Sequence, residues 1–101
     1  MEIFSLILKM KYFIGELIGT YILSSSLNFM ADYTKGGKVN ILEIVIGFLI
    51  AVQTSRKLSG AHLNPGVTLT FYLNSSPEER QNNLPMYKEM LLGQLAGGLL
   101  S

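Results

Sequence analysis

The residues that carry the most chemical information lie in the stretch 59–70, which reads SGAHLNPGVTLT. Asn64 followed by Pro65 is typical of a helix start, because an asparagine oxygen accepts a hydrogen bond from an orphan N–H and proline has no N–H to leave unpaired. The surrounding sequence is apolar, so this helix start would lie at membrane depth. A helix break at that depth is tolerated only where the backbone is buried in protein or lines a water-filled cavity. The pattern therefore favours a channel or a transporter.

The composition independently favours a membrane protein. Apolar residues make up 49% of the 101 residues, and charged residues only 15%, which is well below the soluble norm of about 25%. The net charge of +1 gives no reason to expect nucleic-acid binding. One histidine and no cysteine argue against a zinc site. No acid–base pair accompanies a nucleophile, so we expect neither an enzyme nor a cofactor.

Apolar blocks divide the chain into segments that a bilayer would accept. We expect an all-α membrane protein with membrane spans at about 12–31 and 41–56, a re-entrant loop and half-helix at about 59–73, and a partial third span at 86–101. Within the re-entrant region, the half-helix is expected from Pro65 to Leu73. The third block is 16 residues, or about 24 Å of helix, which is shorter than the ~30 Å hydrocarbon layer. This ending is what a fragment or a truncated product would show.

The flanking segments predict how the chain lies in the membrane. Residues 1–10 form a short amphipathic lead-in, and residues 32–40 form a polar connector. With the N-terminus in the cytoplasm, the inner segments hold six lysines and arginines and the outer connector holds two. By the positive-inside rule, this distribution favours a cytoplasmic N-terminus. The inner set is Lys9, Lys11, Arg56, Lys57, Arg80 and Lys88, and the outer set is Lys35 and Lys38.

The loop sequence also resembles a known family. Residues 59–70 are similar to the first signature loop of the aquaporin (major intrinsic protein) family, SGAHLNPAVT, with Gly66 in place of alanine. Residues 16–20 (ELIGT) resemble the pattern of its first helix, and residues 94–98 (QLAGG) resemble that of its third. The resemblance covers roughly residues 12–101 and corresponds to the first half of a family member. It implies that residues 1–101 are the N-terminal part of one aquaporin-like domain.

The resemblance also implies a set of residues that face the pore. The carbonyl groups of the loop would accept hydrogen bonds from single-file water, while the asparagine amide and the half-helix N-terminus would donate and supply positive potential. The proline and the glycine that follow the asparagine have structural roles there. The set is Gly60, Ala61, His62, Asn64, Pro65 and Gly66.

Three side chains are expected to support the loop. Glu16 lies inside the first span, where an ionisable group is a functional-site hypothesis by default. Its alternative role is to snorkel to the interface. In the family, the matching glutamate holds the loop in shape, and we expect the ring of His62 to donate to it. Gln94 would either hydrogen-bond the loop backbone or pack against it.

The constriction of the pore departs from the family pattern. Many members place an aromatic residue 20 positions before the asparagine, where this chain has Ile44. Phe48 follows one helical turn later and is the other candidate. The choice between water and a solute such as glycerol therefore stays open at this point.

Two functions from different classes follow from these observations. The first is an aquaporin-like channel segment for passive movement of water or small neutral solutes, incomplete without a second half. The second is a non-conducting truncated membrane protein that associates with full-length channels. The expected partners are the lipid bilayer, the solute, and a second channel half or other channel subunits, with a homotetramer as the full-length form.

Overall fold

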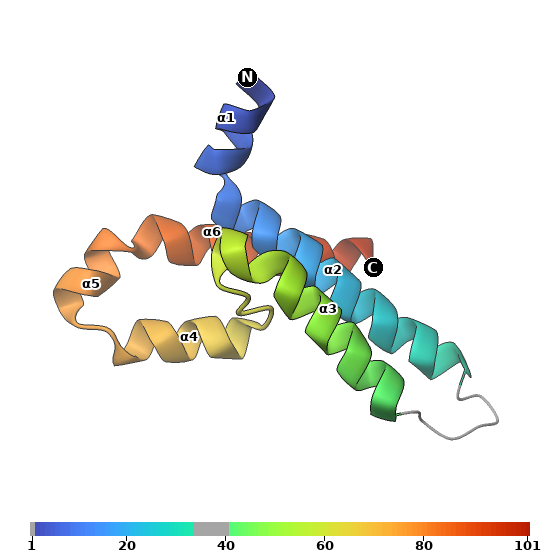
Figure 1. Cartoon of the computed structure of the whole chain (residues 1–101). Coiled ribbons are helices and arrows are strands. Elements are labelled where there is room, and N and C mark those ends of the chain that lie inside the picture. Colours follow the sequence, from blue (N-terminus) through green and yellow to red (C-terminus); the bar gives the residue numbers. More distant parts are fainter. Residues whose placement is uncertain (1, 34–40) are drawn as a thin grey trace.

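All regular structure in the described part of the chain is helical. The computed structural model describes residues 2–33 and 41–101, with side chains at 2–27 and 41–101. Its helices are α1 (Glu2–Lys9), α2 (Lys11–Tyr33), α3 (Ile41–Ser59), α4 (Pro65–Asn74), α5 (Pro77–Asn82) and α6 (Leu84–Leu100) (Figure 1). The predicted all-α class is confirmed for these residues.

The three long helices and the half-helix lie where the sequence predicted them, with boundaries that differ by at most three residues. Residues 34–40 of the predicted polar connector lie outside the described residues. Within the described ranges, no helix combines the length and the apolar character that a membrane span requires. That 12–31, 41–56 and 86–101 cross a membrane therefore stays a prediction.

Helix α2 is the centre of the fold and packs against α3 and α6. Its contact with α3 is lined on the α3 side by small residues at every fourth position, Gly47, Ala51, Ser55 and Ser59, all of them buried. Residues four apart lie on one face of a helix, and small side chains there let two helices approach closely. The spacing of small residues thus explains why α3 lies directly on α2.

Two glycines on α6 make the second contact of α2 equally close. A Cβ atom at Gly93 would lie 2.9 Å from the Cβ of Glu16 and closer still to the carbonyl oxygen of Phe13. A Cβ at Gly97 would meet the carbonyl oxygen of Leu17. The two glycines are four residues apart and face the backbone of α2, as in the small-xxx-small pattern of membrane helices. This contact brings Gln94 to the same level as Glu16.

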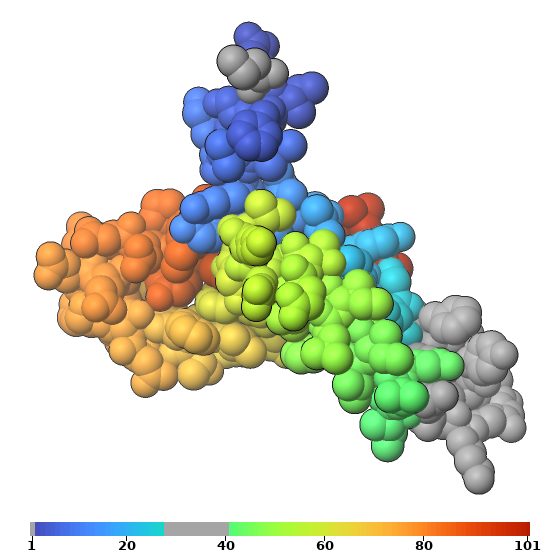
Figure 2. Space-filling model, viewed as in Figure 1, coloured from blue at the N-terminus to red at the C-terminus, as the bar shows by residue number. Residues whose placement is uncertain are grey.

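The interior of the molecule is polar and its outer surface is apolar. Among the residues whose side chains are described, the buried polar ones outnumber the buried large apolar ones, and they include Glu16, Thr68 and Gln94. Large apolar side chains stand on the outer faces instead. Examples are Phe48, Leu49 and Ile50 of α3 and Leu92, Leu95 and Leu99 of α6. Figure 2 shows the space-filling surface of the molecule in the same view.

Candidate pore loop at the start of α4

Helix α4 begins at the predicted cap. Asn64 has extended backbone angles (φ −154°, ψ 128°), and its Oδ1 accepts a hydrogen bond from the Gly66 N–H at 2.7 Å. Its carbonyl oxygen accepts from the N–H groups of Val67 and Thr68 at 3.1 and 3.2 Å. Pro65 occupies the first helical position. The local sequence therefore fixes the helix start in the way that capping rules predict.

The amide nitrogen of Asn64 is left available. Its Oδ1 is engaged by Gly66, and no group in the described ranges accepts a hydrogen bond from Nδ2. The side chain is also exposed. The oxygen of this amide is held by a backbone N–H, as expected of a helix cap. Donation by the NH₂ group to a permeating molecule stays a prediction.

The loop between α3 and α4 has an unusual backbone. Gly60 has φ +89°, and Ala61 and Leu63 both have φ +57°. A left-handed conformation costs a non-glycine residue about 1–2 kcal/mol. Such strain persists only where the surroundings over-determine the conformation. The Gly60 N–H donates to the Arg56 carbonyl at 3.0 Å, which ends α3.

Glu16 provides the main restraint on this loop. Its side chain is fully buried, Oε1 accepts from the His62 N–H at 2.9 Å, and Oε2 accepts from the Leu63 N–H at 2.7 Å. One carboxylate therefore satisfies two consecutive backbone donors of the strained segment. The predicted support by Glu16 is present, but the prediction that the His62 ring is the donor is wrong. The backbone N–H groups of His62 and Leu63 point toward α2 and bond the carboxylate, whereas the His62 ring lies beside Thr68.

Thr68 is the hub of the polar contacts around the loop, and it was not among the residues predicted to support the loop. Its Oγ1 lies 3.0 Å from His62 Nδ1 and 3.4 Å from the Asn64 carbonyl oxygen, and it accepts from Gln94 Nε2 at 2.8 Å. A single hydroxyl can donate once and accept twice, so these three contacts use its whole capacity. The available signal was its position: Thr68 lies one helical turn after the capping asparagine, on the face toward α6.

Gln94 reaches the loop through side chains and not through the loop backbone. Besides its bond to Thr68, Nε2 lies 3.4 Å from Glu16 Oε2. If the Gln94 side-chain amide were flipped, its oxygen would face the Glu16 carboxylate, and two acceptors would then oppose each other. The hydrogen-bond network therefore assigns the amide orientation. Its Oε1 and the Thr20 hydroxyl are buried and have no partner among the described residues.

Two apolar contacts complete the setting of the loop. Leu63 is buried, and its Cδ2 lies so close to Gly19 that any side chain there would clash with it. The His62 ring stacks on the ring of Phe71, with centroids 4.6 Å apart and planes at 22°. Neither Gly19 nor Phe71 was predicted to contact the loop. Both contacts join the loop to a helix, α2 or α4, and local sequence patterns do not predict contacts between separate segments.

The predicted constriction residues lie elsewhere on the molecule. Ile44 and Phe48 belong to the first half of α3, and Phe48 is 49% exposed. The loop follows the last residue of α3, Ser59, which is about 22 Å along the helix axis from Ile44 at 1.5 Å per residue. The structure does not bring these residues to the loop, and their role stays a prediction.

The far end of α4 is held by a second cluster. Arg80 donates from Nε to the Tyr72 carbonyl at 3.0 Å and from Nη2 to the Leu73 carbonyl at 2.8 Å. Its guanidinium also lies 5.4 Å from the centre of the Tyr72 ring, which meets the Tyr87 ring edge-to-face. The Tyr87 hydroxyl lies 3.1 Å from Ser75 Oγ. These contacts hold the end of α4 against α5 and α6.

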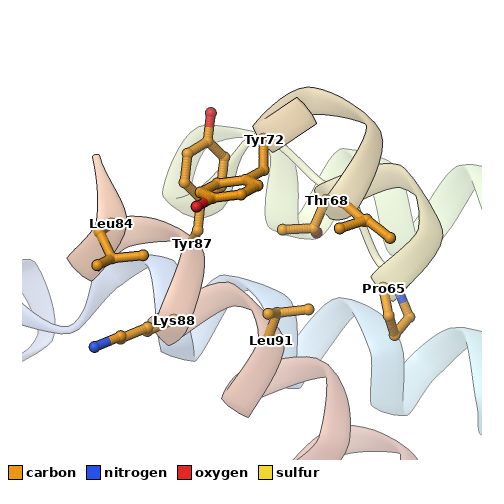
Figure 3. A pocket seen from close by; sticks show the side chains of 8 residues that line it. Pro65, Thr68, Tyr72, Leu84, Tyr87, Lys88 and Leu91 are labelled. Atoms are coloured by element: carbon orange, nitrogen blue, oxygen red, sulfur yellow. The ribbon is translucent and has the colours of Figure 1, made fainter. Parts of the chain in front are cut away.

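An apolar cavity of about 380 Å³ lies between α4 and α6. Figure 3 shows Tyr72 and Thr68 of α4 on one side, with Tyr87 and Leu91 of α6 opposite. Pro65, the first residue of α4, forms part of its wall. The half-helix is therefore bonded to its neighbours through Thr68 and through its C-terminal end, and the cavity lies along its side that faces α6.

Comparison with known proteins identifies the family. The model of the major intrinsic protein family matches residues 4–101. The chain belongs to this family. Major intrinsic proteins are integral membrane channels and not enzymes, which agrees with the expectation from the sequence.

Two relatives place the chain within the major intrinsic proteins. It is 34% identical over 68 residues to the probable aquaporin NIP7-1 of Arabidopsis thaliana, which covers 61% of this chain and 25% of that protein. It is 33% identical over 102 aligned positions to Aquaporin-2 of Rhizopus delemar, which covers 91% of this chain and 32% of that protein. The chain thus spans about a quarter to a third of these relatives. No solved structure matches it.

Proposed function

We propose that this chain forms one part of an aquaporin-like channel wall and supplies its first Asn-Pro loop. The observation that supports this proposal most strongly is the hydrogen bonding of Asn64. Its Oδ1 accepts from the Gly66 N–H, and its Nδ2 has no acceptor among the described residues and is free to donate. A donor at a helix N-terminus, beside a loop with constrained backbone, suits the orientation of single water molecules or of a small neutral solute. A channel of this kind needs a second half or further subunits as partners.

The distribution of polar and apolar residues supports placement in a bilayer. Glu16, Thr68 and Gln94 are almost completely buried and bonded to one another, so none of them faces outward. The outer faces of α3 and α6 carry large apolar side chains that lipid or another subunit would cover. Inward-facing polar groups with internal partners are what membrane proteins use. A cytoplasmic N-terminus, from the lysine and arginine distribution, is part of this proposal.

Water or a small neutral solute remains the proposed cargo. The loop offers hydrogen-bonding groups and no charged side chain directed at a solute, since the carboxylate of Glu16 is engaged by His62 and Leu63 N–H groups. The relatives' names refer to aquaporins, which supports water as the first solute to test.

A chimera tests the proposal directly. Residues 4–101 replace the matching part of Aquaporin-2 of Rhizopus delemar, and osmotic shrinkage of proteoliposomes is followed by stopped-flow light scattering. We expect fast water flow that falls by about tenfold or more in Asn64→Ala, because the free donor and the helix cap are both lost. Asn74→Ala is the matched control, since that exposed asparagine bonds only the Thr70 carbonyl at the far end of α4.

The outcomes separate the two functions considered. A chimera that inserts, remains helical and conducts no water would contradict the channel role and favour a non-conducting protein that only associates with channels. The same stopped-flow measurement is also made on the 101-residue chain alone. We expect it to leave permeability at the lipid background, because the loop lacks an opposing pore wall.

A further inference from the structure

Helix α1 presents an apolar face that no part of the described chain covers. Ile3 and Phe4 are 76% and 67% exposed, and no residue of α1 is buried. At 3.6 residues per turn, these side chains share one face with Leu6, Ile7 and Leu8, whereas Glu2, Ser5 and Lys9 lie on the other face. The helix is therefore strongly amphipathic, and none of the described residues covers its apolar side.

The chain bends between α1 and α2, so α1 stands away from the other helices. Met10 separates the two helices, and its N–H is shared between the carbonyl groups of Leu6 and Ile7 at 3.1 and 3.2 Å. Figure 1 shows α1 projecting from the start of α2, and Figure 2 shows it as a separate lobe. Helix α1 therefore does not continue along the axis of α2.

The residues at this bend are of the types that gather at membrane interfaces. Lys9 and Lys11 flank the bend, and the Lys11 ammonium lies 5.0 Å from the centre of the Tyr12 ring. Lysine at a helix end and tyrosine beside it are the residues that gather at the level of lipid headgroups. If α1 continued straight beyond this level, its apolar residues would enter water. A bend at Met10 instead allows them to remain at the level of the interface.

From these observations we propose that α1 lies along the membrane surface, with its apolar face in the boundary between headgroups and acyl chains. Lys9 and Lys11 face the phosphates of anionic lipids. A second copy of the chain is a poorer occupant, because α1 is 8 residues long, about 12 Å. A stable dimer needs about 800 Å² from each partner. This inference rests on the bilayer placement proposed above.

The chain offers a clean optical test because it contains no tryptophan. Phe4→Trp places the single reporter on the apolar face of α1, and Ser5→Trp is the matched control on its polar face. The full 101-residue protein is reconstituted into phosphatidylcholine–phosphatidylglycerol vesicles whose acyl chains carry bromine either near the headgroup or near the bilayer centre. A third variant, Leu49→Trp, reports on the exposed middle of α3.

We expect the Phe4→Trp emission to be blue-shifted and quenched about twofold more by shallow than by deep bromine, as for a helix lying about 5–10 Å into the interface. Ser5→Trp should stay red-shifted and accessible to iodide. The Phe4→Trp blue shift should shrink when Lys9→Gln and Lys11→Gln are added, because the attraction to anionic lipid is lost.

Each contrary result overturns the proposal in a recognisable way. Stronger quenching of Phe4→Trp by deep bromine would mean that α1 continues the span of α2, and iodide access to it would mean that α1 stands in water. A blue shift that disappears on dilution of the protein in lipid would identify a second copy as the occupant. Deep quenching of Leu49→Trp alongside either result confines the failure to α1. Its absence would overturn the bilayer placement as well.

Discussion

The two ends of α4 are held in different ways. At its N-terminal end, the restraining bonds connect residues far apart in sequence: Glu16 is 46 positions from His62, and Gln94 is 26 positions from Thr68. At its C-terminal end, Arg80 bonds carbonyl groups only 8 and 7 positions away. The first end is thus positioned by the whole fold, and the second largely by its own neighbourhood.

The N-terminal end of α4 is also held by more deeply buried side chains than the C-terminal end. The side chains of Glu16, Thr68 and Gln94 are at most 3% exposed, whereas Arg80 and Ser75 are only half-buried. Buried hydrogen bonds have no water to replace them, so removing one partner leaves the other unsatisfied. The end of α4 that carries Asn64 is therefore the one where small chemical changes should have large effects. The predictions below test this contrast.

The largest effect is expected from Glu16→Ala. It removes the acceptor of two buried N–H groups in a strained loop, and we expect a loss of about 3 kcal/mol or more in the apparent free energy of unfolding. Unfolding in detergent micelles, followed by circular dichroism, measures this loss. Glu43→Ala is the control, because Glu43 is exposed in the first turn of α3. Equal losses in the two variants would contradict the role of Glu16.

Thr68→Val should have the next largest effect. The substitution keeps the shape of the side chain but removes the hydroxyl used by His62 Nδ1 and Gln94 Nε2, at an expected cost of about 1–3 kcal/mol. Thr70→Val is the matched control on the same helix, since its hydroxyl is exposed and bonds only the Gly66 carbonyl. The two variants are compared in the same micelle assay. A control that loses as much as Thr68→Val would remove the contrast between buried and exposed hydroxyls.

The sequence predicted the features that depend on local rules. The start of α4 at Asn64 and Pro65 and the four longer helical segments followed from capping and apolar block length, whereas the contact of Glu16 with the loop was implied by the family resemblance. The residues that determine these helices lie close together in the sequence. The signature loop resemblance then supplied the family.

The details of the buried network could not be predicted in the same way. That Glu16 binds backbone N–H groups, and not the imidazole, depends on the left-handed conformations of Ala61 and Leu63, which no local propensity favours. The hub at Thr68 and the stacking of Phe71 on His62 depend on how α4 lies against α6 and the loop. Such contacts arise from tertiary packing, which local sequence patterns do not reveal.

Arg80→Ala tests the C-terminal end and should have a smaller effect, about 1 kcal/mol, because its partners remain accessible to water. We expect faster hydrogen exchange in the last turn of α4 and unchanged exchange in its first turn. Mass spectrometry of peptides on either side of Leu69 distinguishes the two turns. Arg56→Ala, an exposed arginine near the end of α3, is the control. Faster exchange at both ends of α4 would show that the ends are not independent.

The smallest effect is expected from Gly66→Ala, which restores the residue that the signature loop of the family usually has. Two contributions oppose each other at this position. Alanine favours the helix by up to about 1 kcal/mol relative to glycine. However, a Cβ atom there would lie 3.0 Å from Asn64 Oδ1, the atom that caps the helix. A shift of a few tenths of an ångström relieves this contact but lengthens the 2.7 Å bond to the Gly66 N–H.

We therefore expect the apparent free energy of unfolding of Gly66→Ala to lie within about 0.5 kcal/mol of the parent, because the gain in propensity and the weakened cap offset each other. The variant Asn64→Gly, Gly66→Ala separates the two terms, since it has no side-chain cap to disturb. Relative to Asn64→Gly alone, the alanine should then stabilise the chain measurably. Loss of stability in both backgrounds would mean that the position needs glycine for a reason other than the cap.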